Sequence, residues 1–268
     1  MINHGKWNVL GVNIDALDYE SAVARIVESA KMGTTCTTTA LAVHGLITGC
    51  LNAGHRFRLN TLDLIVPDGQ PVRWALNMLY GLDLRDRVYG PVLTLRVCEA
   101  AGRSGVPVYF YGSRAPVLEA LCSRLKLRCA GLTVAGSQPS KFRQLSRTEF
   151  DTLAAEIKAS GAQILFVGLG CPRQEVFAYE MAGRLNMPIL AVGAAFDYHA
   201  GMLQEPPEIL QRVGLQWLFR LCQEPQRLWR RYMITNSQFV VLLLLQLLHV
   251  WKPSVGDLND PPPEMLYG

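Results

Sequence analysis

The sequence predicts an α/β fold in which a mostly parallel sheet is flanked by helices. Short apolar, β-rich runs alternate with helical patterns over residues 1–204. Most of these runs are continuously apolar, as in strands that are buried on both faces of a sheet. About half of the 268 residues are apolar and only 18% are charged, below the roughly 25% of an average soluble domain. The chain can therefore bury a large core.

The individual elements follow from this alternation. Predicted strands cover residues 7–14, 34–39, 62–66, 106–111, 132–136, 164–167 and 189–192. Predicted helices cover residues 18–31, 42–53, 69–80, 91–103, 114–126, 147–159 and 172–185. Because parallel strands need crossover connections, such helices between strands indicate a Rossmann-like sheet. Ligands of such sheets bind beyond the carboxyl ends of the strands, so the loops there are the places to look for chemistry.

The pattern changes after residue 204. Two prolines at 206 and 207 end the alternation, and residues 205–251 form an all-helical appendage in which Pro225 is suited to open a new helix. Residues 252–268 contain little that could be buried, and we expect them to be a disordered tail. The predicted divisions are thus a core over 1–204, the appendage over 205–251 and the tail.

Three features indicate a cytoplasmic protein. The seven cysteines are odd in number, lie far apart and form no C-x-x-C pair, which argues against a disulfide framework. The first four residues do not resemble a signal peptide. The apolar run 239–251 is interrupted by Gln246 and His249 and is shorter than the roughly 20 residues of a membrane-spanning helix.

Asp68 directly follows the predicted strand 62–66, between Pro67 and Gly69. This position places its carboxylate at the ligand edge of the sheet. A carboxylate there can act as a general base or can bind a sugar hydroxyl. An aspartate at this point can equally cap the following helix, and the two roles are compatible.

The loop from Gly168 to Gln174 follows another predicted strand and leads into a helix. Glycines let a phosphate approach the backbone, and a helix N-terminus offers unpaired N–H groups to it. Arg173 occupies the position of the third glycine of G-x-G-x-x-G, so the dinucleotide motif and a nicotinamide dehydrogenase are disfavoured. Binding of a nucleoside diphosphate is the milder interpretation, and a simple tight turn is the alternative.

The appendage carries an arginine-rich face. Residues 212–231 hold five arginines against one glutamate, a net charge equal to the +4 of the whole chain. At helical spacing Arg220, Arg227 and Arg231 point in similar directions, and apolar residues share another side. Such a face can bind a diphosphate or anionic lipid headgroups, or it can be a solvated, ion-paired surface. No motif or extended basic surface indicates nucleic acid.

His44 begins the helix after the second predicted strand and also faces the ligand edge. No second histidine or carboxylate accompanies it at metal-ligand spacing. We therefore expect no dedicated metal site and no resident cofactor.

Taken together, these motifs resemble the WecG/TagA/CpsF family of bacterial glycosyltransferases over approximately residues 7–235. The resemblance is carried by VPDG (66–69), RVYG (87–90), YG (111–112), GLGCPRQE (168–175), GAAFD (193–197), GLQWLFR (214–220) and EPQRLWRRY (224–232). It implies inverting, metal-independent transfer of an N-acetylmannosamine-like or related sugar from a UDP-sugar to a polyprenyl-diphosphate-linked acceptor, in cell-surface or exopolysaccharide assembly.

The resemblance also implies roles for individual residues. The family's proposed base corresponds to Asp68, its glutamine to Gln174, and its diphosphate-binding arginines to those of the appendage. The expected substrate-binding residues are Thr39, His44, Gly69, Gln70, Arg87, Tyr111, Gly112, Gly168, Gly170, Arg173, Gln174, Ala195, Phe196, Asp197, Arg220, Arg227, Arg230 and Arg231.

The sequence departs from the family at two places. The family's T-x-N triplet is represented by Ala40 and Ala42, and its double glycine before Phe196 by Ala194 and Ala195. The first departure removes two hydrogen-bonding side chains, so either Thr39 or His44 replaces them, or the substrate differs, or catalysis is impaired. A catalytically weakened UDP-sugar-binding subunit, which recruits or regulates an assembly complex, is thus the rival hypothesis.

A lipid-linked acceptor would explain the apolar residues beside the arginine face. We expect peripheral attachment to the anionic inner face of the plasma membrane. The run 239–248 could alternatively contact a second copy of the chain or a membrane-bound enzyme of the same pathway.

Overall fold

A six-stranded parallel sheet forms the centre of the computed structural model, which describes residues 1–253 and 261 and, for Arg227, the backbone alone. The strand order is β4-β3-β8-β7-β5-β6. The strands are β3 (Cys36–Leu41), β4 (Leu64–Pro67), β5 (Val108–Gly112), β6 (Val134–Gln138), β7 (Ile164–Gly168) and β8 (Pro188–Ala191). The predicted α/β class with a parallel, Rossmann-like sheet is confirmed.

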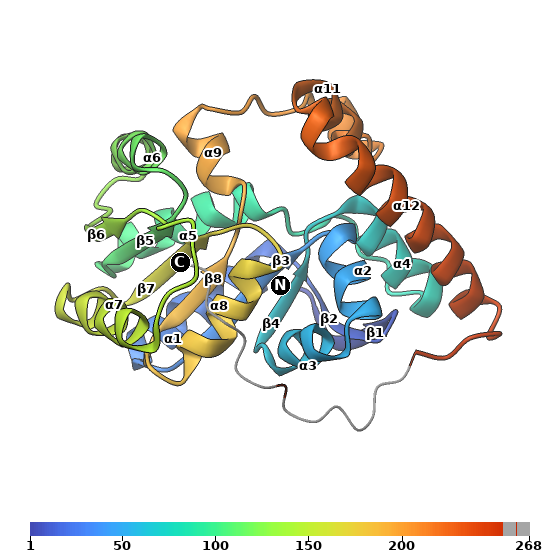
Figure 1. The fold of residues 1–268 in the computed structure, drawn as a ribbon, viewed down its shortest axis with the longest axis horizontal. Helices are drawn as coiled ribbons and strands as arrows, with labels where there is room; N and C mark the ends of the chain where they lie inside the picture. Colours follow the sequence, from blue (N-terminus) through green and yellow to red (C-terminus); the bar gives the residue numbers. More distant parts are fainter. Residues whose placement is uncertain (254–260, 262–268) are drawn as a thin grey trace.

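Helices cover both faces of this sheet (Figure 1). Because successive side chains of a strand point to opposite faces, Phe110 and Phe166 stack on one side, and Tyr111 stacks on Phe177 on the other. The first face is covered by α1 (Tyr19–Met32), α5 (Gly90–Ser104), α6 (Ala115–Arg128) and α9 (Ala195–Ala200). The second is covered by α2 (Val43–Leu51), α3 (Ala53–Thr61), α4 (Gln70–Tyr80), α7 (Arg147–Ala159) and α8 (Arg173–Ala182).

The single strand predicted over residues 7–14 is wrong. The chain forms an antiparallel hairpin of β1 (Asn3–Val9) and β2 (Val12–Leu17). It turns at Leu10 and Gly11, whose φ angles are 51° and 90°. Two consecutive residues with positive φ match the right-handed twist of a two-residue hairpin. The turn was missed because Gly11 lies inside an otherwise apolar run.

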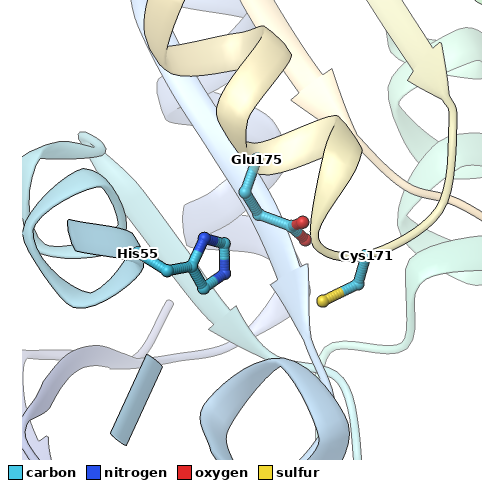
Figure 2. A group of neighbouring side chains, drawn as sticks. All are labelled: His55, Cys171 and Glu175. Carbon is cyan, nitrogen blue, oxygen red and sulfur yellow. The ribbon is translucent and has the colours of Figure 1, made fainter. Parts of the chain in front are cut away.

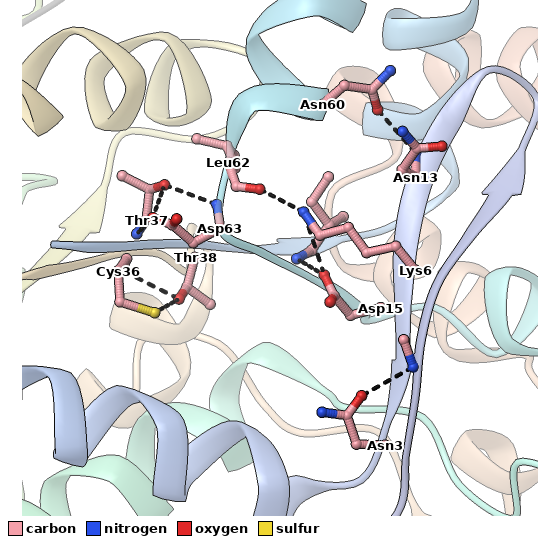
Figure 3. Close-up of polar contacts among 12 residues, drawn as sticks. Asn3, Lys6, Asn13, Asp15, Cys36, Thr37, Thr38, Asn60, Leu62 and Asp63 are labelled. Carbon is pink, nitrogen blue, oxygen red and sulfur yellow. Dashed lines mark hydrogen bonds and ion pairs between the residues drawn. The ribbon is translucent and has the colours of Figure 1, made fainter. Parts of the chain in front are cut away.

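The hairpin is fastened to the β4 edge of the sheet by polar groups, of which Asp15 is buried (Figure 3). The Asp15 carboxylate accepts a 2.7 Å hydrogen bond from the amide of Ile65, and the Lys6 ammonium donates to the Leu62 carbonyl at 2.7 Å. Beside them, Asp63 accepts from both the amide and the hydroxyl of Thr37. These contacts hold β3 and β4 in register just below the loop that carries Asp68.

The predicted helix over residues 42–53 is also incomplete, because the chain forms two helices, α2 and α3, in this region. They are separated by Asn52, whose backbone is extended and whose side chain accepts from the amide of His55 at 2.8 Å. An asparagine at this position is a strong N-cap signal. Since α3 is largely polar, its periodicity did not reveal it.

Three C-terminal helices, α10 (Glu208–Arg212), α11 (Gln216–Gln223) and α12 (Pro225–Leu247), follow the sheet. Pro225 opens α12, as predicted. Phe239 and Leu243 are 5% exposed and belong to the core cluster around α2 and the hairpin, and α12 runs beside α2 and α4 (Figure 1). The appendage is therefore packed against the sheet domain, while the division at residue 204 stays a prediction.

Two further sequence expectations concern the C-terminal part. The disordered tail was predicted over residues that, apart from 252, 253 and 261, lie outside the described part of the chain. Within that described part, none of the helices combines the length and the apolar character needed to cross a bilayer.

Candidate active site

A cavity of about 1230 Å³ lies at the carboxyl ends of the strands, larger than the roughly 300–1,000 Å³ of most small-molecule sites. Loops that follow β3, β4, β7 and β8 form one wall, and α11 and α12 form the other. This is the edge where open α/β sheets bind ligands. Predicted site residues that line it are His44, Asp68, Gly69, Gln70, Arg87, Gly168, Gly170, Arg173, Gln174, Ala195, Asp197, Arg220 and Arg231.

Asp68 is held at the end of β4 by contacts with a different helix from the one it precedes. Its Oδ1 accepts a 2.6 Å hydrogen bond from the amide of Gly90, the first residue of α5. Gly69, and not Asp68, is the N-cap of α4. Burial raises the pKa of Asp68, while Arg87, the Gly90 amide and Arg220 counteract that rise. The carboxylate is thereby made more basic than usual and remains open to the cavity.

Arg87 connects the Asp68 loop with the C-terminal helices. Its guanidinium, which lies 4.3 Å from the centre of the Tyr89 ring, donates to the backbone carbonyl of Asp68 at 3.1 Å. The same group donates to the side-chain oxygen of Gln216 on α11. Since Arg87 is only 4% exposed, it serves as a buried link as much as a ligand group.

The glycine loop after β7 shows why small residues are required there. A Cβ at Gly168 would lie 2.5 Å from the ring of Phe196, and Gly170 has a φ of +78°, a conformation that glycine adopts without strain. The loop leads into α8, so its N-terminal amides and Arg173 lie at the cavity wall. A helix N-terminus combined with a guanidinium suits an anionic ligand.

Gln174 and Thr39 both contact a buried carboxylate. Gln174 Nε2 and Thr39 Oγ1 each donate to Glu175 Oε1 at 3.0 Å. Gln174 Oε1 is buried without a hydrogen-bond partner among the described residues and lies near Gly193 in the cavity wall. Thr39 is fully buried and is not among the lining residues, so it orients Glu175 from behind the wall.

The appendage arginines are placed differently from one another. Arg220 and Arg231 line the cavity, and Arg220 lies close enough to Asp68 to lower its pKa. Arg220 also lies 5.9 Å from the centre of the Tyr198 ring and 3.5 Å from Glu224. Arg230 instead sits on Trp229 outside the cavity. Arg227 belongs to α12, but its side chain lies outside what the structure describes.

The next part of the cavity lining comes from the end of β3 and the segment after it. Ala40, Ala42 and His44 all line the cavity. Burial, together with the positive charge of Arg231 and the neighbouring His55, lowers the pKa of His44 to about 4. His44 is therefore neutral at pH 7, and its buried Nδ1 has no hydrogen-bond partner among the described residues.

Besides Thr39 and Arg230, three predicted binding residues lie away from the cavity. Tyr111 is 2% exposed, stacks on Phe177, and lines a separate cavity of about 140 Å³. A Cβ at Gly112 would collide with the backbone of Gly168, and Phe196 is fully buried against Phe110. These residues shape the strand ends by packing and do not reach the cavity surface.

The sequence indicated apolar residues over 239–248 beside the arginine face but did not show that they line an end of the cavity. Trp74 and Met78 of α4 face Val240, Leu243 and Leu244 of α12 across it. Val240 and Leu244 are more than half exposed although they line the cavity, so this end is open. Apolar residues recur every three or four positions along α12, which indicates an apolar helix face. That this face lines a cavity depends on how α12 packs on α4.

A cluster of metal-binding side chain types lies behind the glycine loop. His55, Cys171 and Glu175 place their ligand atoms within 4.8 Å of one another (Figure 2). Burial and the nearby Arg58 lower the pKa of His55 to about 4, so its imidazole is neutral. His44, the histidine that was considered as a possible metal ligand from the sequence, is not part of this cluster.

Residues 7–253 match the model of the family described as "Glycosyl transferase WecG/TagA/CpsF family". The matched region contains the whole parallel sheet, every residue of the cavity wall and the three C-terminal helices.

Proposed function

This chain belongs to the WecG/TagA/CpsF family of glycosyltransferases, and from that premise we propose that it transfers a sugar from a UDP-sugar, N-acetylmannosamine-like or related, to a polyprenyl-diphosphate-linked acceptor. The product would be an intermediate of cell-surface or exopolysaccharide assembly. The observation that carries the proposal is the meeting of Asp68 and Arg220 on one cavity, although they lie on opposite walls and far apart in the sequence.

The charges of the cavity support binding of a diphosphate. Five arginines line it against three carboxylates, and the N-terminus of α8 opens onto it. Guanidinium groups bind phosphate oxygens through two parallel hydrogen bonds. We place the UDP diphosphate between the loop Gly168–Gln174 and Arg220 and Arg231, where fixed cations and amide dipoles stabilise the leaving group without a metal at that point.

Asp68 is the proposed general base. The acceptor hydroxyl attacks the anomeric carbon while the bond from that carbon to the UDP β-phosphate oxygen breaks. The hydroxyl proton passes to Asp68, and the electron pair of the broken bond leaves with UDP. A single displacement of this kind inverts the anomeric centre. The raised pKa of Asp68 suits a base, because proton transfer is most efficient when the pKa of the base approaches the working pH.

The apolar end of the cavity supports a lipid-linked acceptor. Trp74, Met78 and the inner face of α12 offer apolar surface beside the arginines. Outside the cavity lining, α12 and its C-cap residue add exposed apolar side chains, which are Trp229, Met233, Ile234, Val241 and Leu248. An apolar stripe next to cationic groups suits attachment to an anionic membrane surface. We propose that the protein binds the inner face of the plasma membrane peripherally.

One observation favours a second candidate function. Ala40 and Ala42 line the cavity beside Asp68 and leave no side-chain donor or acceptor at the two positions where the related motif has threonine and asparagine. A UDP-sugar-binding subunit that recruits or regulates an assembly complex would keep the arginines and tolerate this loss. A transferase with a different donor or acceptor would tolerate it as well.

Release of UDP separates the two functions. Purified protein is incubated with candidate UDP-sugars, with and without a lipid extract that contains polyprenyl-diphosphate-linked glycans. The transferase releases UDP in proportion to acceptor, over many turnovers. A binding subunit retains the UDP-sugar and gives no acceptor-dependent UDP, which would overturn the proposed activity.

A further inference from the structure

Three side chains from separate segments converge behind the glycine loop (Figure 2). His55 comes from α3, Cys171 from the loop after β7, and Glu175 from the first turn of α8. Their ligand atoms, an imidazole nitrogen, a thiol sulfur and a carboxylate oxygen, all lie within 4.8 Å of one another. Together they form a mixed nitrogen, sulfur and oxygen donor set of the kind that transition metals bind.

The buried polar atoms of this cluster have few partners. His55 is 3% exposed and Glu175 is 1% exposed. The Cys171 thiol donates a hydrogen bond to the Glu175 carboxylate. Neither ring nitrogen of His55 nor the Oε2 atom of Glu175 has a hydrogen-bond partner of good geometry among the described residues. Buried polar groups without partners cost free energy and are uncommon. A bound metal ion would satisfy one ring nitrogen of His55 together with the Oε2 atom of Glu175.

The surroundings orient these side chains toward one another. Thr39 Oγ1 and Gln174 Nε2 both donate to Oε1 of Glu175, which fixes the carboxylate and leaves Oε2 for the cluster. Gly45 provides the space for the thiol, because a Cβ at that position would lie 3.2 Å from Cys171 Sγ. Hydrogen-bonded supports of this kind are typical of the residues that surround metal ligands.

We propose that His55, Cys171 and Glu175 bind a zinc ion or a similar divalent transition metal. A neutral imidazole, a thiolate and a carboxylate balance the two positive charges of the ion, so the filled site is neutral and suited to burial. Bonds of about 2.0–2.3 Å from each ligand to the ion draw the three side chains slightly closer than they stand. Cys171 also lines the large cavity, whereas His55 and Glu175 are buried.

The ion would act on the position of the glycine loop. It joins α3 to the loop before α8 through Cys171 and to the first turn of α8 through Glu175, and Arg173 and Gln174 lie between these two ligands in the sequence. The site lies behind the wall and not among the arginines that face the cavity, so its role is to hold the loop. It is independent of the sugar-transfer proposal, because it rests on the cluster alone.

Binding of Co²⁺ tests the site directly. Full-length protein without a polyhistidine tag is stripped with a chelator and titrated with Co²⁺, whose bond to a thiolate gives a charge-transfer absorption. We expect saturation at about one equivalent, displacement of Co²⁺ by Zn²⁺, and a higher melting temperature with Zn²⁺. These readouts need no substrate, so they stand whether or not UDP is released.

Matched variants assign the signal. Cys171→Ser removes the charge-transfer band, whereas Cys222→Ser, at an exposed cysteine, keeps it. Thr39→Val weakens Co²⁺ binding by about 10- to 100-fold, the usual effect of removing a support of a metal ligand, and His55→Gln weakens it further. If the wild type binds no stoichiometric Co²⁺, or if Cys171→Ser retains the band, the proposal fails. Should Cys171→Ser not fold, His55→Gln decides the assignment through affinity, and unchanged Co²⁺ binding by that variant would contradict the site.

Discussion

Asp68 shows how a single carboxylate can have a structural and a chemical role. One oxygen accepts from the Gly90 amide at 2.6 Å and so caps α5, whereas the sequence suggested a cap of α4. The carboxylate nevertheless lines the cavity. Its pKa is raised by burial and held back by Arg87, the Gly90 amide and Arg220. The cap fixes the side chain, and the balance of burial and charge sets its basicity.

The pH dependence of activity tests this balance. A general base works only when deprotonated, so the rate falls as the pH drops through the pKa of Asp68. Because that pKa is raised, the acid limb of kcat/KM should lie above the ordinary aspartate value of about 3.9. Arg220→Gln removes a cation that lowers the pKa, and it should move the limb to higher pH.

Arg212→Gln provides the control for this prediction. The Arg212 side chain is 81% exposed and pairs with Glu208, so its loss should leave the limb where it is. An acid limb that does not move in Arg220→Gln would show that Arg220 does not act on the base.

At the scale of elements, the loop after β7 depends on close packing with α9. Gly168→Ala would place a Cβ 2.5 Å from the ring of the fully buried Phe196. Overpacking of this kind typically costs about 1–3 kcal/mol, so the variant should unfold at a lower denaturant concentration. The measurement is a chemical unfolding curve that compares midpoints at an unchanged slope.

Gly183→Ala is the matched control. Its φ is −71° and nothing lies within 4 Å of a Cβ built there. This substitution should be neutral or slightly stabilising, because it restricts the unfolded chain. Equal stability of the two variants would mean that Phe196 gives way, and that the glycine is not required by packing.

The sequence predicted the strands that are buried along most of their length. It missed elements that are marked only by a single turn or cap residue. Strands β5 and β7 are buried along most of their length and read as continuous apolar runs. The hairpin turn at Gly11 and the Asn52 cap of α3 were hidden, the first by apolar neighbours and the second by a polar helix. Strand ends were displaced by one or two residues, since boundaries depend on backbone pairing and not on hydropathy.

The site was predictable to the extent that strand order brings loops together. Asp68 and Gln174 follow strands, so their meeting at one edge follows from the topology. Arg87, by contrast, was expected to bind substrate, and its hydrogen bond to Gln216 depends on how α11 packs. The cluster of His55, Cys171 and Glu175 joins segments with no common motif. Such contacts are set by tertiary packing, which spacing along the chain does not encode.

At the scale of the whole molecule, α11 and α12 form one wall of the cavity, and α12 also carries exposed apolar side chains. Phe239 and Leu243 anchor α12 in the core, and Gln246 accepts from the Leu10 amide and donates to the Asn8 carbonyl. Residues such as Met233 and Val241 remain 59% and 56% exposed. One helix thus contributes to the core, the cavity wall and the proposed membrane-facing surface.

Flotation with anionic liposomes tests that surface. Deleting the C-terminal helices would expose the core around Phe239, so point substitutions test the surface without disturbing the fold. Met233→Glu combined with Val241→Glu should strongly reduce recovery with the liposomes, because it places two negative charges on the apolar stripe. Leu127→Glu, at an 87% exposed leucine on α6, should not. Equal recovery of both variants would place the membrane contact elsewhere.

The rate of UDP release by Asp68→Asn tests the central claim most directly. Asparagine keeps an oxygen that can accept from the Gly90 amide, so the fold should be retained, but it cannot take the acceptor proton. We expect acceptor-dependent UDP release to fall by about 10²–10⁴, the usual contribution of a general base, while UDP-sugar binding persists and the exposed control Asp83→Asn stays at the wild-type rate. Release by Asp68→Asn within a few-fold of wild type would contradict the assignment of this carboxylate as the base.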